Sequence, residues 1–287
     1  MITIEQEKCT ACGICVDICH EYCMHIENDI LAIDHTYCSN CTQCIAVCPQ
    51  QALSWDNTEP ELFNKENFPT SLELEELLRE RRTIRFFKDK TVGRNLLEEV
   101  VGYAVYAPTH DFNLRAIIVN DRKLIELADK RIFRVTSSIY KWLYRPKFIF
   151  RFVKWFAPGN VHEYLKAKPK LEASMARGRN FKSVIPALVF IVARKGNPLT
   201  LESAQYALYN IDLYARTRGL GCRNLVGNQM FLNNRNFRKN IGLRKDERIY
   251  ATMALGYPAI KFRNKVNGKK MSIQWNTGND QGSADLS

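Results

Sequence analysis

The sequence predicts a mixed α and β chain built from two dissimilar domains. Nine of the ten cysteines lie before residue 50. Residues 1–60 hold one Lys against nine Asp and Glu, a net charge of −8, whereas the rest of the chain holds 41 basic and 21 acidic side chains, a net charge of +20. We therefore expect an acidic domain over 1–58, a polar linker over 59–72 and a basic domain over 73–287.

Apolar patterning and cysteine usage indicate a cytoplasmic protein. The longest apolar run, Val184 to Ala193, contains Pro186 and is too short to span a bilayer, so it predicts a buried strand. The first residues lack the basic and then apolar pattern of a secretory signal. In a reducing compartment, ten cysteines are expected to serve as metal ligands rather than as disulfides.

Two cysteine runs repeat a single spacing within the acidic domain. Each run has three cysteines two residues apart and a fourth after three more residues: Cys9, Cys12, Cys15 and Cys19, then Cys38, Cys41, Cys44 and Cys48. Three thiolates on one loop can reach three irons of a cubane, and the fourth iron needs a thiolate from elsewhere. The runs resemble those of bacterial two-cluster ferredoxins, in which the fourth cysteine of each run serves the other cluster.

This resemblance assigns two [4Fe–4S] clusters to the acidic domain. Its ligand sets are Cys9, Cys12, Cys15 and Cys48 for the first cluster, and Cys38, Cys41, Cys44 and Cys19 for the second. A structural zinc site is the alternative, but it pairs two C-x2-C knuckles and has no use for a third cysteine at the same spacing. Cys23 remains without an iron and is expected to be a buried apolar thiol.

The basic domain opens with a predicted helix that leads into an arginine cluster. Thr70 and Glu73 form a capping-box pattern ahead of leucines at helical spacing. The stretch "RRTIRFF" (81–87) follows directly. Its arginines suit the C-terminal end of a solvated helix. The alternative is a binding site for a phosphate and an electron-rich ring, because guanidinium groups suit both.

Three further segments accompany this cluster in a fixed order. "YAPTHDFNLRAIIV" (106–119) leads into a strand-like stretch, and "TRGLGCRNLVG" (217–227) forms a Gly-rich turn after a helix. "ATMALGYPAIKFRNK" (251–265) is a strand that ends in Gly-Tyr-Pro and a basic stretch. The Gly-rich turn is no dinucleotide fingerprint, since that motif must follow a strand.

Taken together, these segments resemble the FMN-dependent nitroreductase family, and the whole chain is similar to its ferredoxin–nitroreductase fusion branch over residues 5 to 275. The resemblance implies an α+β fold with a central antiparallel sheet flanked by helices. It also implies a homodimer with FMN at the subunit interface. Strand-like segments at 115–120, 186–193 and 249–256 agree with such a sheet.

The resemblance also implies the FMN-binding residues. Arg81, Arg82 and Thr83 would hold the phosphate end, and Arg85 would lie near the N1/O2 edge of the ring, where a cation stabilises reduced flavin. The remaining positions carried over are Pro108, Thr109 and His110 along the ring face, Asn113 in the same loop, a backbone N–H near Gly227 at flavin N5, and Arg263 or Lys269 as a last phosphate ligand.

The expected function is that of an iron–sulfur flavoprotein oxidoreductase. Electrons from NAD(P)H or from a low-potential donor such as an external ferredoxin would pass through two [4Fe–4S] clusters and FMN to an organic acceptor, such as a nitroaromatic or a quinone. No catalytic side chain is assigned, because solvent can supply protons, although His110 is a conceivable donor. The alternative is a non-catalytic electron carrier or redox sensor whose large domain is a docking module.

The basic aromatic segment 131–159 allows three interpretations. It suits a lid or dimer contact, a membrane-surface helix, or a nucleic-acid surface. Substrate-side helices of the resembled family vary in this part of the chain, which favours the lid or dimer contact over membrane contact. No nucleic-acid motif is present, so no nucleic-acid partner is expected. Pro146 should interrupt any long helix here.

Overall fold

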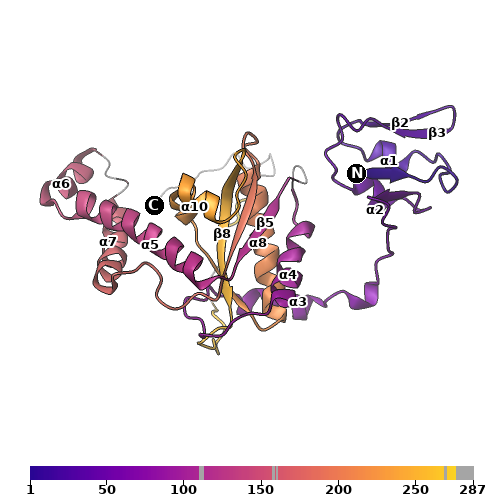
Figure 1. The fold of residues 1–287 in the computed structure, drawn as a ribbon. Coiled ribbons are helices and arrows are strands. Elements are labelled where there is room, and N and C mark those ends of the chain that lie inside the picture. The colour runs from indigo at the N-terminus through magenta and orange to yellow at the C-terminus, as the bar shows by residue number, and fades with distance from the viewer. Residues whose placement is uncertain (110–112, 157–158, 160, 268–269, 276–287) are drawn as a thin grey trace.

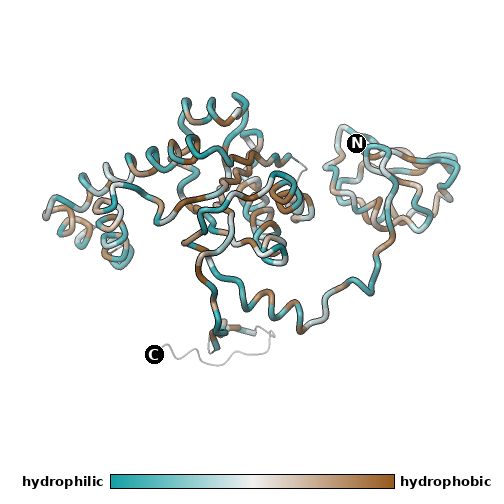
Figure 2. The backbone as a smooth tube through the Cα atoms, turned by 60° about the horizontal axis from the view of Figure 1, so that its bottom comes forward, coloured by the Kyte–Doolittle hydropathy of each residue, from teal (hydrophilic) through white to brown (hydrophobic). Residues whose placement is uncertain are grey.

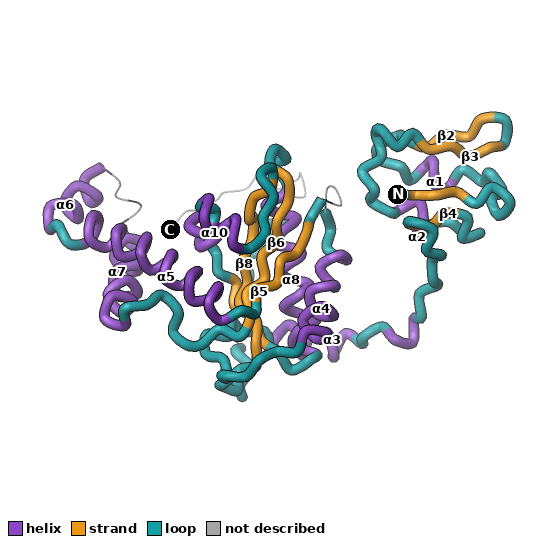
Figure 3. The backbone as a smooth tube through the Cα atoms, viewed as in Figure 1, coloured by secondary structure: helices purple, strands orange, loops and turns teal. Residues whose placement is uncertain are grey.

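The computed structural model describes residues 1–109, 113–156, 159, 161–267 and 270–275 (Figure 1). A small N-terminal unit precedes a larger unit in which a single sheet is flanked by helices (Figure 3). Apolar stretches gather where the sheet and its helices pack, as the brown parts of the tube in Figure 2 show. Within the described residues, no helix combines the length and apolar character needed to cross a bilayer.

The N-terminal unit consists of two antiparallel strand pairs and two short helices. Strand β1 pairs with β4, and β2 pairs with β3. The elements are β1 (Ile2–Ile4), α1 (Ile14–Asp17), β2 (Met24–Glu27), β3 (Ile30–Ile33), α2 (Gln43–Val47) and β4 (Leu53–Trp55). Buried Ile2, Leu31 and Leu53 form its core together with several cysteines.

The backbone conformation of this unit repeats at the same interval as its cysteine spacing. Ala11 and Gly13 have φ values of 49° and 81°, and Asn40 and Thr42, 29 positions later, have 58° and 62°. These left-handed values are uncommon outside glycine. Their recurrence at one offset means that both cysteine runs adopt the same loop, which ends immediately before α1 in one case and before α2 in the other.

The larger unit is built on a four-stranded antiparallel sheet of order β5-β6-β8-β7. Its strands are β5 (Arg115–Val119), β6 (Ala187–Arg194), β7 (Gly221–Asn224) and β8 (Glu247–Gly256). Seven consecutive residues of β6 are buried, as expected of a central strand covered on both faces. The α+β prediction is thus confirmed, and its three strands are found within two residues of their expected bounds. Strand β7 was not expected, because its four residues lie within the stretch that was interpreted as a Gly-rich turn.

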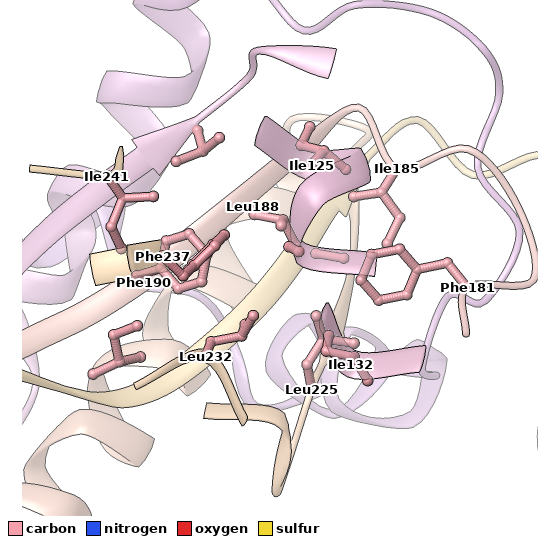
Figure 4. Close-up of a cluster of buried hydrophobic side chains, with 14 of the residues drawn as sticks. Ile125, Ile132, Phe181, Ile185, Leu188, Phe190, Leu225, Leu232, Phe237 and Ile241 are labelled. Carbon is pink, nitrogen blue, oxygen red and sulfur yellow. The ribbon is translucent and has the colours of Figure 1, made fainter. Parts of the chain in front are cut away.

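Alternation along β6 divides the core between the two faces of the sheet. Leu188, Phe190 and Val192 point to one face, where they meet α5, α9 and α10 (Figure 4). Ala187, Val189 and Ile191 point to the other face, where they meet α4 and α8. The helices of both faces are α4 (Arg94–Gly102), α5 (Arg122–Ile139), α8 (Thr200–Thr217), α9 (Asn228–Leu232) and α10 (Arg235–Asn240).

Helix α3 (Ser71–Glu80) opens the larger unit, after a 3₁₀ turn at η1 (Lys65–Asn67). The Thr70 hydroxyl accepts a hydrogen bond from Glu73 N–H, and the Glu73 carboxylate accepts one from Thr70 N–H, at 3.2 and 2.8 Å. The predicted capping box is therefore confirmed. Because α3 ends at Glu80, the arginine cluster lies in the extended segment after the helix.

The middle of the chain forms an arm that extends from the sheet. Helix α5 begins against the sheet and continues into a π-helical turn, η3 (Tyr140–Tyr144). Helix α6 (Lys147–Phe156) lies beyond the C-terminal end of α5, away from the strands, and α7 (Val161–Arg177) returns and contacts α5 (Figure 1). As predicted, Pro146 separates α6 from the preceding helix. A 3₁₀ turn, η2 (Tyr103–Tyr106), links α4 to the loop before β5.

The segment after α3 runs along the edge of the sheet. Ile84 N–H donates to the Cys222 carbonyl of edge strand β7 at 2.9 Å, and Lys88 N–H donates to the Tyr257 carbonyl at 2.9 Å. Gly221 permits this close passage, because a Cβ at that position would collide with the Ile84 side chain. The sheet edge thereby fixes the position of the arginines.

We predict that Gly221→Ala lowers the free energy of unfolding by about 1–3 kcal/mol, because the added methyl overpacks a closed site. The new Cβ would also lie 3.0 Å from Pro258 Cγ, and Ile84 is only 5% exposed. Urea denaturation followed by circular dichroism measures the change.

Gly102→Ala is the matched control. Gly102 has a helical φ of −56°, and a Cβ there meets nothing within 4 Å. It should leave the unfolding free energy unchanged or raise it by up to about 1 kcal/mol. Equal losses at both glycines would contradict the prediction.

Candidate functional site

A pocket of about 410 Å³ lies on the segment that follows α3. Four arginines line it together with one hydroxyl and two apolar side chains: Arg79, Arg81, Arg82, Arg85, Thr83, Phe262 and Val266. All four residues that the sequence placed in the "RRTIRFF" part of the site are therefore brought together. Such a concentration of guanidinium groups around an open volume is suited to an anion.

Among the described residues, two of these arginines are paired with carboxylates. Arg79 contacts Glu75 at 2.6 Å, and Arg81 lies 3.5 Å from the Asp212 carboxylate. Arg82 donates to backbone carbonyls alone, at 2.8 and 2.9 Å. Neither Arg82 nor Arg85 has a carboxylate partner in the described part of the chain. Two positive charges in the pocket are thus left for a ligand.

Asp212 on α8 helps to hold the backbone of the arginine cluster in place. It is 4% exposed and lies 3.2 Å from the guanidinium of Arg216, which is buried as well. Arg216 in turn donates to the Arg82 carbonyl at 2.5 Å, so the buried pair fixes the backbone of the arginine cluster. Burial, with the Asp212 charge as the next cause, raises the pKa of the Cys222 thiol well above its usual range. Cys222 is therefore a neutral core side chain.

The C-terminal segment closes one side of the pocket. It is held to α3 by an ion pair between Lys265 and Glu76 and by a hydrogen bond from Arg79 to Asn267 at 2.5 Å. Phe262 and Val266, four residues apart, supply the lining. The predicted ligand Arg263 is exposed and does not line the pocket, and Lys269 lies outside the described residues.

The other predicted FMN residues that the structure describes do not line this pocket within one chain. Thr109 lines a separate pocket of about 180 Å³ beside α4 and β5. Pro108 precedes it and is exposed, Asn113 is half-buried ahead of β5, and His110 lies outside the described residues. Gly227 adopts a left-handed φ of 85° immediately before α9. The predicted arginine residues therefore line one pocket, whereas Pro108, Thr109 and Asn113 of the predicted site lie outside it.

Arg115 and Arg223 have roles that the sequence did not indicate. Arg115 donates to both carboxylate oxygens of buried Glu247, at 3.0 and 2.6 Å, and this pairing holds the pKa of Glu247 below its usual range. Arg115 is therefore a structural residue. Burial, followed by the nearby charge of Arg85, lowers the pKa of Arg223 on β7. Arg223 does not line the pocket, but it lies on β7, along which the arginine segment runs.

The eight cysteines of the two runs surround two cavities in the N-terminal unit. One cavity is lined by Cys9, Cys12, Cys15 and Cys48, and the other by Cys19, Cys38, Cys41 and Cys44. Each cavity therefore takes three thiols from one run and the fourth from the other run. Among the described residues, no three potential ligands are grouped closely enough to hold a single metal ion.

Cys23 also lines the second cavity. Its sulfur lies 3.5 Å from Cys19 Sγ, and the side chain is 4% exposed, which confirms the expected buried thiol. Burial raises the pKa of the Cys15 thiol, and it raises the pKa of the Cys44 thiol to about 12.

Comparison with known proteins agrees with this fold. Over 70% of the chain, the structure is similar to an FMN-bound nitroreductase from Bacteroides fragilis NCTC 9343, with 16% identity, 99% of that chain covered and a TM-score of 0.50. It is also similar to an FMN-bound nitroreductase from Desulfitobacterium hafniense DCB-2, with 15% identity over 70% of this chain and 97% of that one, and a TM-score of 0.51. No curated protein matches the chain.

A match to a family of proteins defines the enzyme class. Residues 78–257 match the nitroreductase family, which is most of the chain. The chain belongs to the nitroreductase family. The enzyme class expected from the sequence is thereby confirmed.

We predict that Asp212→Asn lowers the free energy of unfolding by about 3–5 kcal/mol, because it leaves the buried Arg216 guanidinium without its counter-charge. Asp246→Asn is the control, since Asp246 pairs with Arg194 at 3.4 Å on an exposed surface. That change should cost less than about 1 kcal/mol. Urea denaturation of both variants decides, and similar losses would show that the buried pair has no special role.

Proposed function

We propose that the arginine pocket binds FMN. The observation that carries this proposal is the pair of arginines, Arg82 and Arg85, that line the pocket without a carboxylate partner among the described residues. A phosphate supplies the counter-charge that Arg82 lacks, and the electron-rich edge of the flavin ring suits the unpaired guanidinium of Arg85. The two structural neighbours, although too distant in sequence to establish more than the fold, both hold FMN.

In this proposal each side of the pocket has a separate task. Arg81, Arg82 and Thr83 bind the phosphate end, and Arg85 is the cation for the N1/O2 edge of the ring. Phe262 and Val266 provide apolar surface and exclude water on the side formed by the C-terminal segment. When bound, FMN supplies the exchange between one-electron and two-electron chemistry.

We further propose that a second copy of the chain completes the site, as the expected homodimer requires. Pro108, Thr109 and Asn113 lie outside the arginine pocket of their own chain, so a partner subunit is needed if this loop is to cover the flavin face. Arg263 and Gly227 keep their proposed roles at the phosphate and at flavin N5, and solvent supplies protons.

The N-terminal unit is proposed to hold two [4Fe–4S] clusters. Three features support this: the eight thiols of the two runs, two cavities that each take four of them, and the exchange of the fourth cysteine between runs. A single ion draws its ligands to one point, whereas in a cluster each thiolate binds its own iron. The thiol arrangement is therefore compatible with clusters although it offers no single-ion site within the described residues.

Backbone conformation supports the same proposal. Gly13 and Thr42 are left-handed residues followed directly by helical residues, at equivalent places in the two runs. A left-handed residue next to a right-handed one directs successive N–H groups into a concavity, and such concavities bind anions, including many iron–sulfur centres. Each cavity would thus offer N–H donors to a negatively charged cluster.

The proposed activity is transfer of electrons from NAD(P)H or a low-potential donor to a small organic acceptor, such as a nitroaromatic or a quinone. The two parts of the chain would make it an iron–sulfur flavoprotein oxidoreductase with an N-terminal ferredoxin-like domain. Membership of an enzyme family favours this activity over the alternative of a non-catalytic carrier or sensor. Turnover with reduced ferredoxin and with NAD(P)H, compared on one preparation, distinguishes the donors.

We predict that Arg85→Ala weakens FMN binding by about tenfold to a hundredfold, the effect of losing one charge-assisted hydrogen bond. Titration of flavin-free protein with FMN, followed by flavin fluorescence, gives the dissociation constant. Arg94→Ala is the control, because Arg94 is a surface arginine of α4 that pairs only with Glu98 in the described structure. An affinity unchanged by Arg85→Ala would remove the arginine pocket from consideration.

We predict about eight irons and eight sulfides per chain in anaerobically purified protein. Cys48→Ala should alter the first cluster alone, because Cys48 lies with Cys9, Cys12 and Cys15, and should leave the second intact. Iron analysis, together with electron paramagnetic resonance of the reduced protein, detects the difference. Cys23→Ala is the matched control and should retain the full iron content. Zinc in place of iron, or an effect of Cys48→Ala on the second cluster alone, would contradict the ligand sets.

A further inference from the structure

The arm presents an aromatic surface that the described protein leaves uncovered. On α6, Phe148, Phe152, Trp155 and Phe156 are 70%, 58%, 79% and 66% exposed. These positions follow the i, i+4, i+7, i+8 pattern, so they form one stripe along the helix. Trp142 on the preceding η3 turn is 80% exposed. Soluble surfaces rarely leave so many large aromatic side chains together, which indicates a binding face.

The opposite side of α6 is occupied within the arm. Phe150 packs on Tyr164 of α7 with a ring-centroid distance of 5.6 Å, and Tyr164 stacks on Tyr144 at 4.4 Å. The Tyr164 hydroxyl also donates to the Leu143 carbonyl at 2.7 Å. Helix α6 is thus held on α7 by one face, while its aromatic stripe is left free to contact a partner.

The charge of the arm identifies the partner. Residues 131–177 contain eleven Lys and Arg but only two Glu, a net charge of +9. Arg151 and Lys154 are exposed on α6 itself, and Arg151 precedes Trp155 by one helical turn. Aromatic side chains bordered by cations are the pattern of a helix that lies in the headgroup region of a bilayer. The cations meet lipid phosphates, and the rings enter the apolar boundary.

We propose that the arm binds the surface of an anionic lipid bilayer, with the aromatic stripe of α6 and Trp142 inserted at the headgroup level. A second copy of the chain is a poorer occupant, because a symmetric contact would bring two arms of charge +9 against each other. The acidic residues 1–60 are complementary in charge to the arm, but a contact based on charge does not account for five exposed aromatic side chains. This inference does not depend on what the arginine pocket binds.

The test is binding of the purified full-length protein to lipid vesicles. Vesicles with one-quarter phosphatidylserine in phosphatidylcholine are compared with phosphatidylcholine alone by flotation, and tryptophan emission is recorded. We expect flotation with the anionic vesicles only, accompanied by a blue shift. Trp155→Glu with Phe156→Glu should abolish flotation. Arg151→Gln with Lys154→Gln should weaken it by about tenfold or more.

Trp275→Glu is the matched control, because Trp275 is 82% exposed and lies outside the arm. It should leave flotation unchanged. Three results would overturn the proposal. They are no flotation with anionic vesicles, flotation that survives Trp155→Glu with Phe156→Glu, and loss of dimers in sedimentation analysis of that variant without any lipid binding by the unmodified protein.

Discussion

The hydrogen bond from Ile84 N–H to the Cys222 carbonyl is the contact on which the candidate site depends. It lays an extended segment against edge strand β7, and the arginines follow from that placement. The buried pair of Asp212 and Arg216 holds the same segment from α8 by way of the Arg82 carbonyl. A surface rich in positive charge is therefore built on a neutral sheet edge and one buried carboxylate. The Arg82 and Arg85 guanidinium groups are thereby left without a carboxylate in the described part of the chain, while the backbone on either side of Thr83 is held by hydrogen bonds.

The N-terminal unit obeys a different constraint, that of internal duplication. Ala11 and Gly13 recur as Asn40 and Thr42 with the same left-handed backbone. Neither run is complete alone, since each cavity takes one cysteine from the other run. The two halves must therefore fold together, and a change to Cys19 or Cys48 acts on the cavity that is distant in sequence. The larger unit has no such repeat: its order comes from strands that pair across long separations.

Local patterns were sufficient wherever the interaction is local. The capping box at Thr70 and the break at Pro146 could be predicted from spacing, because each depends on residues a few positions apart. The thiols that line the two cavities are grouped as in the ligand sets that the resemblance implies. The lining residues Phe262 and Val266 could not, since only the return of the C-terminal segment over α3 brings them to the pocket. Strand β7 and Arg223 were missed for a similar reason: a Gly-rich stretch becomes a strand only where β8 offers it an edge.

Helix α5 belongs to two environments at once. Ile125, Ala128 and Ile132 are buried in the core of the sheet, with at most 6% exposed, whereas the same helix continues into η3 and carries α6 and α7 beyond it. An attachment of this kind differs from a flexible tether, because α5 and η3 form a continuous helix up to Tyr144, and a helix transmits direction as well as distance. A surface bound by the arm would therefore fix the orientation of the sheet. The opening of the arginine pocket would then lie at a set angle to that surface.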